Sequence, residues 1–440
     1  MDILIKIAQL FLCFTILVGI HELGHFLMAR AFKIRVEKFY IFFDPWFSLF
    51  KFKRGDTEYG LGWLPLGGYV KIAGMIDESL DTEQMKQPVR PDEFRTKPAW
   101  QRLLVMVAGV MMNVLLAIVI YCAVCYTWGD SYFSNQDAKW GYNFNPTAHE
   151  MGFRDGDRFV SIDGEEIDNV MRVQNDLLIT DGGRRVVVER SGEPVTLDIP
   201  FESLLRMRQE KAYEDLFTLR LPFIVDSVSY TSAVEAGLQS GDEVVAIDDL
   251  RDADYPRYRD YLQKHKNDKV LLTVRRDGAL IDSLALPVDA EGRIGVTVTN
   301  PYSLRTQYYT FWESIPAGIH KAGKTISSYW DQLKLIVQPK TKMYEELGGF
   351  VAIGSIFPGS WDWHDFWLKT AFLSIILAVM NLLPIPGLDG GHALFTLWEI
   401  ITRRKPSEKF LEVAQYVGLM IILALLVYAN GNDIYRFFIK

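Results

Sequence analysis

Two histidines and a glutamate stand close together in a segment that is otherwise apolar. Residues 17–30 read LVGIHELGHFLMAR, so His21, Glu22 and His25 form the pattern H-E-x-x-H. On a helix, residues i and i+4 share one face, and the two imidazoles can hold one Zn²⁺ with Glu22 beside it as general base. Acidic and basic residues inside a membrane helix cost about 2.5–3.5 kcal/mol each, and a bound metal would compensate for them. Histidines satisfied by neighbouring helices are the alternative interpretation.

The third ligand of such a site must come from elsewhere, because a catalytic zinc site uses three protein ligands and a water. Residues 379–395 read VMNLLPIPGLDGGHALF, in which two prolines and a glycine interrupt an apolar run just before Asp389. Proline breaks a helix, and irregular backbone at membrane depth is tolerated only where it is buried in protein or lines a cavity. Asp389 is therefore the preferred third ligand. His392, three residues later, is its rival.

The composition of the whole chain indicates a membrane protein. The chain has 440 residues, 49% of them hydrophobic, and a formal net charge of −8 with no long basic run, so nucleic acid is not an expected partner. The three cysteines lie in apolar segments, which argues against disulfides, and apolar packing is favoured over a metal or redox role for the C-x-x-C pair at 122 and 125. Four apolar stretches qualify or nearly qualify as membrane helices: 3–20, 103–126, 366–388 and 411–429.

Positive charge predicts the orientation of these four spans. Lysines and arginines cluster after the first span (30–38), before the second (90–102) and between the third and fourth (403–409). Such clusters mark the cytoplasmic side, so both chain termini and segment 130–365 are expected on the opposite side. With a rise of about 1.5 Å per helical residue, the candidate ligands of the first and third spans fall at the same cytoplasmic depth.

The outer segment contains an internal repeat. Residues 146–167 (PTAHEMGFRDGDRFVSIDGEEI) and 229–250 (SYTSAVEAGLQSGDEVVAIDDL) share a helix start, a glycine, a Gly-Asp pair and a strand that ends in Asp. This pattern resembles a tandem of circularly permuted PDZ domains, which bind peptides by strand addition. The candidate carboxylate loop at 221–226 lacks the usual glycines, so a spacer or steric filter is an equal alternative. Residues 302–336 predict an amphipathic helix, either at the membrane surface or packed on a PDZ-like module.

These motifs together resemble the site-2 protease family of intramembrane zinc metalloproteases, of the bacterial regulator-of-sigma-E protease type with two PDZ domains. The resemblance rests on H-E-x-x-H in the first span and on NLLPIPGLDG (381–390) in the third. EYGLGWLPLGGYVKIAGM (58–75) is similar to the family's membrane-associated β-hairpin. AGVMMNVLLA (108–117) is similar to its G-x-x-x-N element, and ELGGFVAIG (346–354) to its glycine-bearing segment.

The resemblance implies a role for each matching residue. His21, His25 and Asp389 would bind one Zn²⁺ per chain, and Glu22 would be the general base for a water that zinc acidifies. Two asparagines and three hairpin residues would contact substrate or shape the pocket: Asn113, Asn381, Gly67, Gly68 and Tyr69. The hairpin edge would hold a transmembrane helix unwound by strand addition.

The predicted fold is a polytopic α-helical membrane protein with four transmembrane helices, a membrane-associated β-hairpin and two inserted α+β PDZ-like domains. The expected segments are 1–32 (first span), 33–102 (cytoplasmic-side loop and hairpin), 103–128 (second span), 129–215 and 216–300 (PDZ-like domains), 301–365 (amphipathic periplasmic helix and connector), 366–400 (third span) and 401–440 (cytoplasmic loop and fourth span).

The predicted function is zinc-dependent cleavage of single-span membrane proteins within or near their transmembrane helix, in the bacterial inner (cytoplasmic) membrane. The resemblance implies anti-sigma factors already trimmed outside as substrates, and also remnant signal peptides. The lipid bilayer is an expected partner, as is a peptide C-terminus at the PDZ-like domains. A membrane-anchored PDZ scaffold with a structural zinc site is the alternative from another class, and a metal transporter is disfavoured because residues 3–17 offer almost no polar path.

Overall fold

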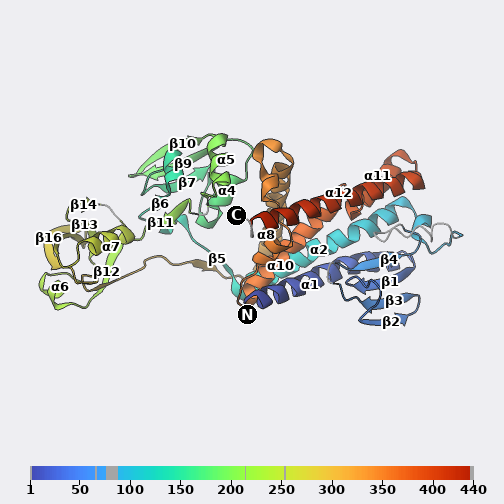
Figure 1. Cartoon of the computed structure of the whole chain (residues 1–440), viewed down its shortest axis with the longest axis horizontal. Helices are drawn as coiled ribbons and strands as arrows, with labels where there is room; N and C mark the ends of the chain where they lie inside the picture. Colours follow the sequence, from blue (N-terminus) through green and yellow to red (C-terminus); the bar gives the residue numbers. More distant parts are fainter. Residues whose placement is uncertain (1, 65–66, 76–87, 214, 252–253, 437–440) are drawn as a thin grey trace. The chain divides into compact units, whose positions relative to one another are not determined.

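The chain folds into two units, seen in a computed structural model that describes residues 2–64, 67–75, 88–213, 215–251 and 254–436. The helical unit comprises Met1–Asp130 and Gln307–Lys440, and the inserted unit comprises Ser131–Thr306. Figure 1 shows the long helices of the first unit and the small sheets of the second. The candidate site lies wholly within the helical unit.

Four helices of the helical unit are long and apolar enough to cross a membrane, as predicted. They are α1 (Asp2–Ala31), α2 (Ala99–Trp128), α10 (Trp363–Leu382) and α12 (Glu408–Ile434). The two prolines after Leu382 end α10, because proline disfavours helix at the preceding residue and removes a backbone donor. The chain then turns and begins a separate helix, α11 (Asp389–Thr402).

Helix α2 lies at the centre of the helical unit and packs against α1, α10, α11 and α8 (Phe311–Val337). Its contact with α1 is close, because a Cβ on Gly24 would lie 2.5 Å from the Ala108 carbonyl oxygen. Its contact with α8 also depends on a glycine, since a Cβ on Gly318 would lie 2.5 Å from Cys122 Sγ. The helix expected within 302–336 is thus present as α8 and packs along α2.

A four-stranded sheet follows α1, and its topology corrects the predicted hairpin at 58–75. The strand order is β2-β3-β1-β4, with bounds Phe50–Arg54, Thr57–Leu61, Val36–Ile41 and Tyr69–Ile72 in that order. Strand β1 pairs in parallel with β3 and antiparallel with β4, so the two expected hairpin arms do not pair with each other. The reason is burial: Val36 and Tyr40 of β1 are fully buried, and the strand that carries them takes a central position. Among the described strands, β4 is left at an edge.

The inserted unit contains two similar modules. In the first, the sheet order is β10-β9-β7-β8, and in the second it is β16-β15-β13-β12-β17 with β14 paired to β13. The first module has strands β7 (Arg158–Ile162), β8 (Glu165–Glu166), β9 (Arg184–Arg190) and β10 (Glu193–Ile199), with helices α3 (Pro146–Glu150), α4 (Val173–Leu178) and α5 (Phe201–Gln209). The second has strands β12 (Phe223–Val228), β13 (Glu243–Ile247), β14 (Leu250–Arg251), β15 (Lys269–Arg276), β16 (Ala279–Pro287) and β17 (Val296–Val298), with helices α6 (Thr231–Glu235) and α7 (Tyr255–Lys264).

The repeated Gly-Asp pairs make the same contacts in both modules. Asp157 accepts two hydrogen bonds of 2.8 Å from Arg190, whose guanidinium also donates to the Gly152 carbonyl. Asp242 accepts bonds of 2.6 and 2.7 Å from Arg276, which donates likewise to the Gly237 carbonyl. The repeat therefore has a structural basis in a buried carboxylate that ties a helix-to-strand turn to a later strand. A PDZ identity for the modules stays a prediction.

The first module extends past the predicted boundary at 215. Strand β11 (Phe217–Leu219) pairs with β6 (Tyr142–Phe144) of the first module, and Leu216 is buried in that module's core. Two further strands, β5 (Asp130–Tyr132) and β18 (Arg305–Gln307), pair where the chain enters and leaves the inserted unit.

Candidate metal centre

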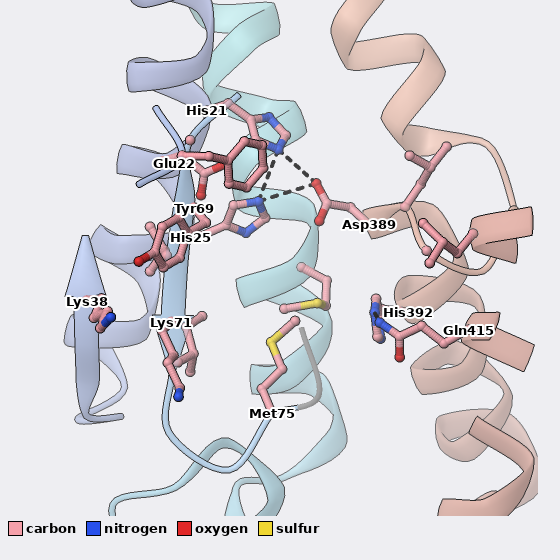
Figure 2. A pocket seen from close by; sticks show the side chains of 18 of the residues that line it. His21, Glu22, His25, Lys38, Tyr69, Lys71, Met75, Asp389, His392 and Gln415 are labelled. Carbon is pink, nitrogen blue, oxygen red and sulfur yellow. Dashed lines mark hydrogen bonds and ion pairs between the residues drawn. The ribbon is translucent and has the colours of Figure 1, made fainter. Parts of the chain in front are cut away.

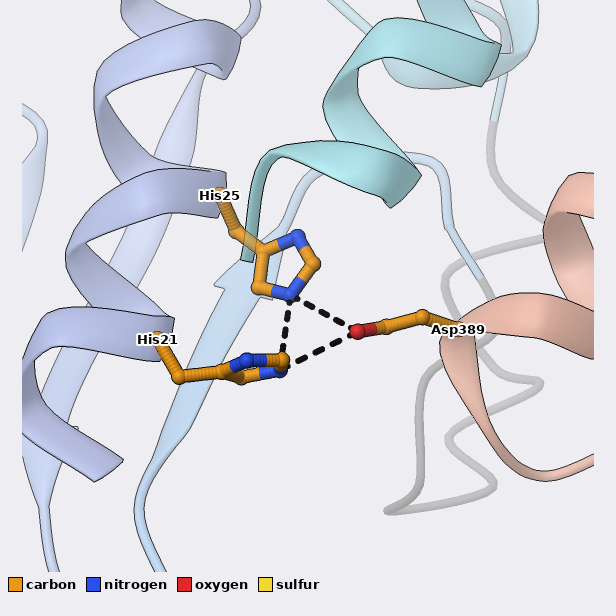
Figure 3. Close-up of side chains that lie close together, drawn as sticks. All are labelled: His21, His25 and Asp389. Atoms are coloured by element: carbon orange, nitrogen blue, oxygen red, sulfur yellow. Dashed lines mark hydrogen bonds and ion pairs between the residues drawn. The ribbon is translucent and has the colours of Figure 1, made fainter. Parts of the chain in front are cut away.

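The three predicted ligands meet at one point. His21 Nε2 lies 3.0 Å and His25 Nε2 lies 3.3 Å from Asp389 Oδ2, and the two imidazole nitrogens are 3.2 Å apart. Figure 3 shows the triangle that these atoms form between α1 and the start of α11. Both histidines are 7% exposed, so the cluster is withdrawn from solvent. Among the described residues this is the one group of three or more His, Cys, Asp or Glu side chains able to share a metal ion.

Local backbone geometry explains why these residues meet. His21 and His25 are one helical turn apart on α1, and Asp389 is the first residue of α11. The turn before α11 packs closely against the start of that helix. A Cβ on Gly391 would lie only 2.5 Å from the Ile385 carbonyl oxygen, so the approach requires glycine. Gly390 is equally crowded by the carbonyl of Leu383. The prolines and the glycines together aim the Asp389 carboxylate at α1.

The donor set fits a metal ion. His25 Nδ1 lies 2.8 Å from the Val105 carbonyl, which can only accept, so the proton is on Nδ1 and the Nε2 lone pair faces the triangle. Asp389 Oδ2 is buried and, in the described part of the chain, receives no hydrogen bond of acceptable geometry despite the two nearby nitrogens. Lone pairs converging without shared protons repel one another, and a cation at their centre relieves this repulsion.

The two predicted asparagines both contact His21. Asn113 Nδ2 lies 3.3 Å from His21 Nδ1, and Asn381 Nδ2 lies 3.3 Å from His21 Nε2. A neutral imidazole has one N–H and one lone pair, so it cannot accept from both amides. Asn113 is fully buried, and its Oδ1 has no hydrogen-bond partner among the described residues. A half-turn of the Asn113 amide lets Oδ1 accept from His21 Nδ1–H, which frees Nε2 for a metal.

Glu22 lies beside the triangle on a different face of α1 and lines the adjacent cavity. The chain just before the edge strand β4 lies close to it, since a Cβ on Gly68 would lie 3.5 Å from Glu22 Cγ. Gly68 makes this approach possible, since a Cβ there would lie 2.9 Å from a Val18 methyl and 2.7 Å from the Tyr40 carbonyl oxygen. Glu22 is therefore placed next to the metal centre without being a member of the triangle.

A cavity of about 930 Å³ opens between β4 and the helices α11 and α12. Figure 2 shows Glu22 and Tyr69 on one wall and His392 and Gln415 on the other. Gly68 lines the cavity with them, and Gly67 has a φ of 151° and packs against the Phe43 ring. The cavity can hold an extended peptide beside the triangle.

His392, the rival ligand, is in the cavity wall and not in the triangle. Its Nε2 lies 3.3 Å from the Gln415 amide of α12. Sequence reasoning missed Gln415, which is 4% exposed, and Asp44, whose carboxylate accepts the Tyr69 hydroxyl at 3.0 Å. Gln415 could have been identified from the sequence by one signal, its position as a glutamine inside a predicted membrane span.

Comparison with known proteins agrees with this geometry. The model of Peptidase family M50 matches residues 9–425. A protein of Haemophilus influenzae named regulator of sigma E protease is 27% identical, with 99% of this chain and 100% of the relative covered. A protein of Vibrio cholerae named as a zinc metalloprotease is 29% identical, with 99% of each chain covered. The predicted metalloendopeptidase class is thereby confirmed, and the printed names agree with the predicted zinc. The chain belongs to Peptidase family M50, the site-2 proteases.

Proposed function

We propose that this protein is a zinc-dependent intramembrane endopeptidase that cleaves single-span membrane proteins within or near their transmembrane helix. The observation that carries the proposal is the convergence of His21, His25 and Asp389 between helices long enough to span a membrane. An aqueous metalloprotease has no need to build its metal centre on such helices. A peptide bond that lies in the bilayer can be reached only from a site at the same depth.

Each residue of the site has a separate role in the proposed hydrolysis. His21, His25 and Asp389 would hold the zinc ion, which as a Lewis acid polarises the scissile carbonyl and lowers the pKa of water. Glu22 takes the proton of the attacking water and returns it to the leaving amine. Asn113 orients the His21 ring from the side away from the metal. Asn381, whose Nδ2 lies 3.3 Å from His21 Nε2, would donate a hydrogen bond to the substrate carbonyl.

Strand β4 would hold the substrate. A transmembrane helix hides its peptide bonds, so the segment must be extended before water can attack. Tyr69 and Val70 of β4 line the cavity together with the preceding Gly68, and among the described strands β4 has a partner on one side only. Strand addition on its other side would supply the hydrogen bonds that the unwound segment has lost. The edge strand thus takes the role that the predicted hairpin was expected to play.

The setting of the reaction follows from the same reasoning. The protein would lie in the bacterial inner membrane with its metal centre toward the cytoplasmic side and the inserted unit in the periplasm. The two modules of the inserted unit would act as PDZ-like domains that exclude untrimmed substrates by bulk or bind a new C-terminus. Anti-sigma factors already trimmed outside, and remnant signal peptides, fit these limits.

A reconstituted cleavage assay tests the proposal. Purified full-length protein with zinc is placed in vesicles with a single-span substrate, with and without the substrate's outer domain. We expect Glu22→Gln to abolish cleavage while zinc content stays at one per chain, and the exposed Glu193→Gln on β10 to cleave normally. Equal turnover by wild type and Glu22→Gln would contradict the mechanism, and normal biological function of Glu22→Gln would favour a scaffold. Equal turnover of trimmed and untrimmed substrates would exclude only the size filter.

A further inference from the structure

Helix α12 is largely exposed, and at the depth of the metal centre its buried face meets the turn that precedes α11. Within the described part of α12, the buried residues are Gln415, Gly418 and Asp433. The first two are three residues apart and share one face of the helix. Gln415 reaches His392 on α11, as Figure 2 shows, and Gly418 meets Pro386 in the turn. This face of α12 is therefore packed on the segment that carries a predicted zinc ligand.

The contact at Gly418 leaves no room for a side chain. The Pro386 carbonyl oxygen occupies the place that a Cβ on residue 418 would take, and Pro386 Cα would lie 3.0 Å from that Cβ. The turn presents a glycine in return, since a Cβ on Gly387 would lie 3.5 Å from the Leu419 backbone nitrogen and 3.3 Å from Ile422 Cδ1. The backbones of the turn and of α12 therefore touch directly, as small residues allow between membrane helices.

The turn and the start of α11 form one hydrogen-bonded block. The Leu388 amide donates to the Ile385 carbonyl at 3.0 Å, and the Gly391 amide donates to the Leu388 carbonyl at 3.0 Å. Asp389 lies between these bonds, two residues after Gly387. Closely packed segments transmit a displacement and do not absorb it, so a shift of the turn against α12 moves the Asp389 carboxylate as well.

We propose that Gly418 is a positioning residue of the metal centre, which acts through the turn to place the Asp389 carboxylate at the two imidazoles. This inference rests on the proposed function, and specifically on Asp389 as a zinc ligand. Ala393 of α11 packs among residues of α2, which fixes that helix, and the turn ahead of it takes its position from α12. Helix α12 thus contributes to metal binding although none of its residues is a ligand in the triangle.

Metal binding by full-length variants tests the inference. Gly418→Ala puts a methyl group where the Pro386 carbonyl oxygen lies, so either the turn or α12 must move. Its control is Gly431→Ala on the same helix, because a Cβ on Gly431 meets nothing within 4 Å. A second pair removes a contact without adding bulk: Ile422→Ala deletes a side chain that packs on the turn, and Ile421→Ala deletes its exposed neighbour.

Three measurements are made on each variant. Competition with a zinc chelator gives the zinc affinity. The visible spectrum of the Co²⁺-loaded protein reports the arrangement of the ligands. Hydrogen exchange in α1 and α2 shows whether the helical unit is folded.

We expect Gly418→Ala to bind zinc at least about tenfold more weakly than wild type, because zinc tolerates ligand displacements of only about 0.2 Å. Its Co²⁺ spectrum should differ from that of wild type, which a loss of stability without ligand movement would not produce. Ile422→Ala should lose zinc affinity by a smaller factor, and both controls should match wild type.

Wild-type zinc affinity and an unchanged Co²⁺ spectrum in folded Gly418→Ala would overturn the inference, and so would equal losses of affinity in the controls. If Gly418→Ala does not fold, equal zinc affinity in Ile422→Ala and Ile421→Ala overturns it. A wild-type protein that binds no zinc would instead contradict the proposed function.

Discussion

Gly109 of α2 stands directly against His21 of α1: a Cβ at residue 109 would lie 2.8 Å from His21 Nε2 and 2.6 Å from its Cε1. The same added atom would crowd His25 Nε2 even more closely. The two imidazoles can therefore converge only because α2 has no side chain at this position. The metal centre therefore requires glycine at position 109 of α2 as well as the ligands on α1 and α11.

Replacing Gly109 with alanine should disrupt the metal centre. In Gly109→Ala, one or both imidazoles must move by a few tenths of an ångström or more, and zinc geometry tolerates only about 0.2 Å. We expect zinc affinity to fall by at least about tenfold, with a parallel loss of cleavage. Gly19→Ala is the control, because a Cβ on Gly19 in α1 meets nothing within 4 Å. Normal zinc content and activity in Gly109→Ala would show that the packing of α2 does not limit the site.

Asn113 should affect zinc binding without touching the metal. In Asn113→Leu the buried amide that orients His21 is replaced by an apolar group of similar size. Loss of such an outer partner typically lowers metal affinity about 10- to 100-fold. Competition with a zinc chelator measures the change. Ser374→Ala is the matched control, since its hydroxyl donates to the Asn113 backbone carbonyl and leaves the amide in place; unchanged affinity in Asn113→Leu would exclude the orienting role.

Asp389 and His392, the two candidate zinc ligands on α11, should respond differently to substitution. Asp389→Asn removes an anionic ligand from the triangle, and we expect purified protein to lose most of its zinc and all of its activity. His392→Gln should keep a full complement of zinc, because His392 contacts Gln415 and is outside the triangle. Metal analysis of the two purified variants side by side decides between them. Zinc loss in His392→Gln with retention in Asp389→Asn would reverse the assignment.

Much of the site could be predicted from sequence because its signals are short-range. The spacing of His21 and His25 implies a shared helix face, and prolines next to Asp389 imply a break at membrane depth. The order of strands could not be predicted, because β1 takes its place between β3 and β4 through the burial of Val36 and Tyr40, which no local pattern reveals. The role of Gly109 was equally hidden. A glycine in an apolar helix suits close packing, and only the structure shows that its neighbours are the two imidazoles.

Asp242 should stabilise the second module of the inserted unit in a pH-dependent way. Burial of this fully buried carboxylate raises its pKa, but the Arg276 guanidinium and the Gln239 backbone amide outweigh burial and lower the pKa below its usual value. A lowered folded-state pKa contributes stability that is present above the unfolded value of about 3.9 and is lost as pH falls through the folded value. Asp242→Asn leaves the guanidinium without its charged partner at every pH. We expect amides of β13 and β15 to exchange hydrogen roughly tenfold faster in this variant at pH 7.

Hydrogen exchange of the full-length protein, followed by mass spectrometry, measures this effect module by module. Asp157→Asn makes the equivalent change in the first module, where Arg190 is the partner, so each variant serves as the control for the other. The acceleration should stay within the module that has the substitution, because each carboxylate bonds only to its own module's turn and strand among the described residues. Equal exchange in wild type and Asp242→Asn would show that the Asp–Arg pair sets the shape of the turn without stabilising it.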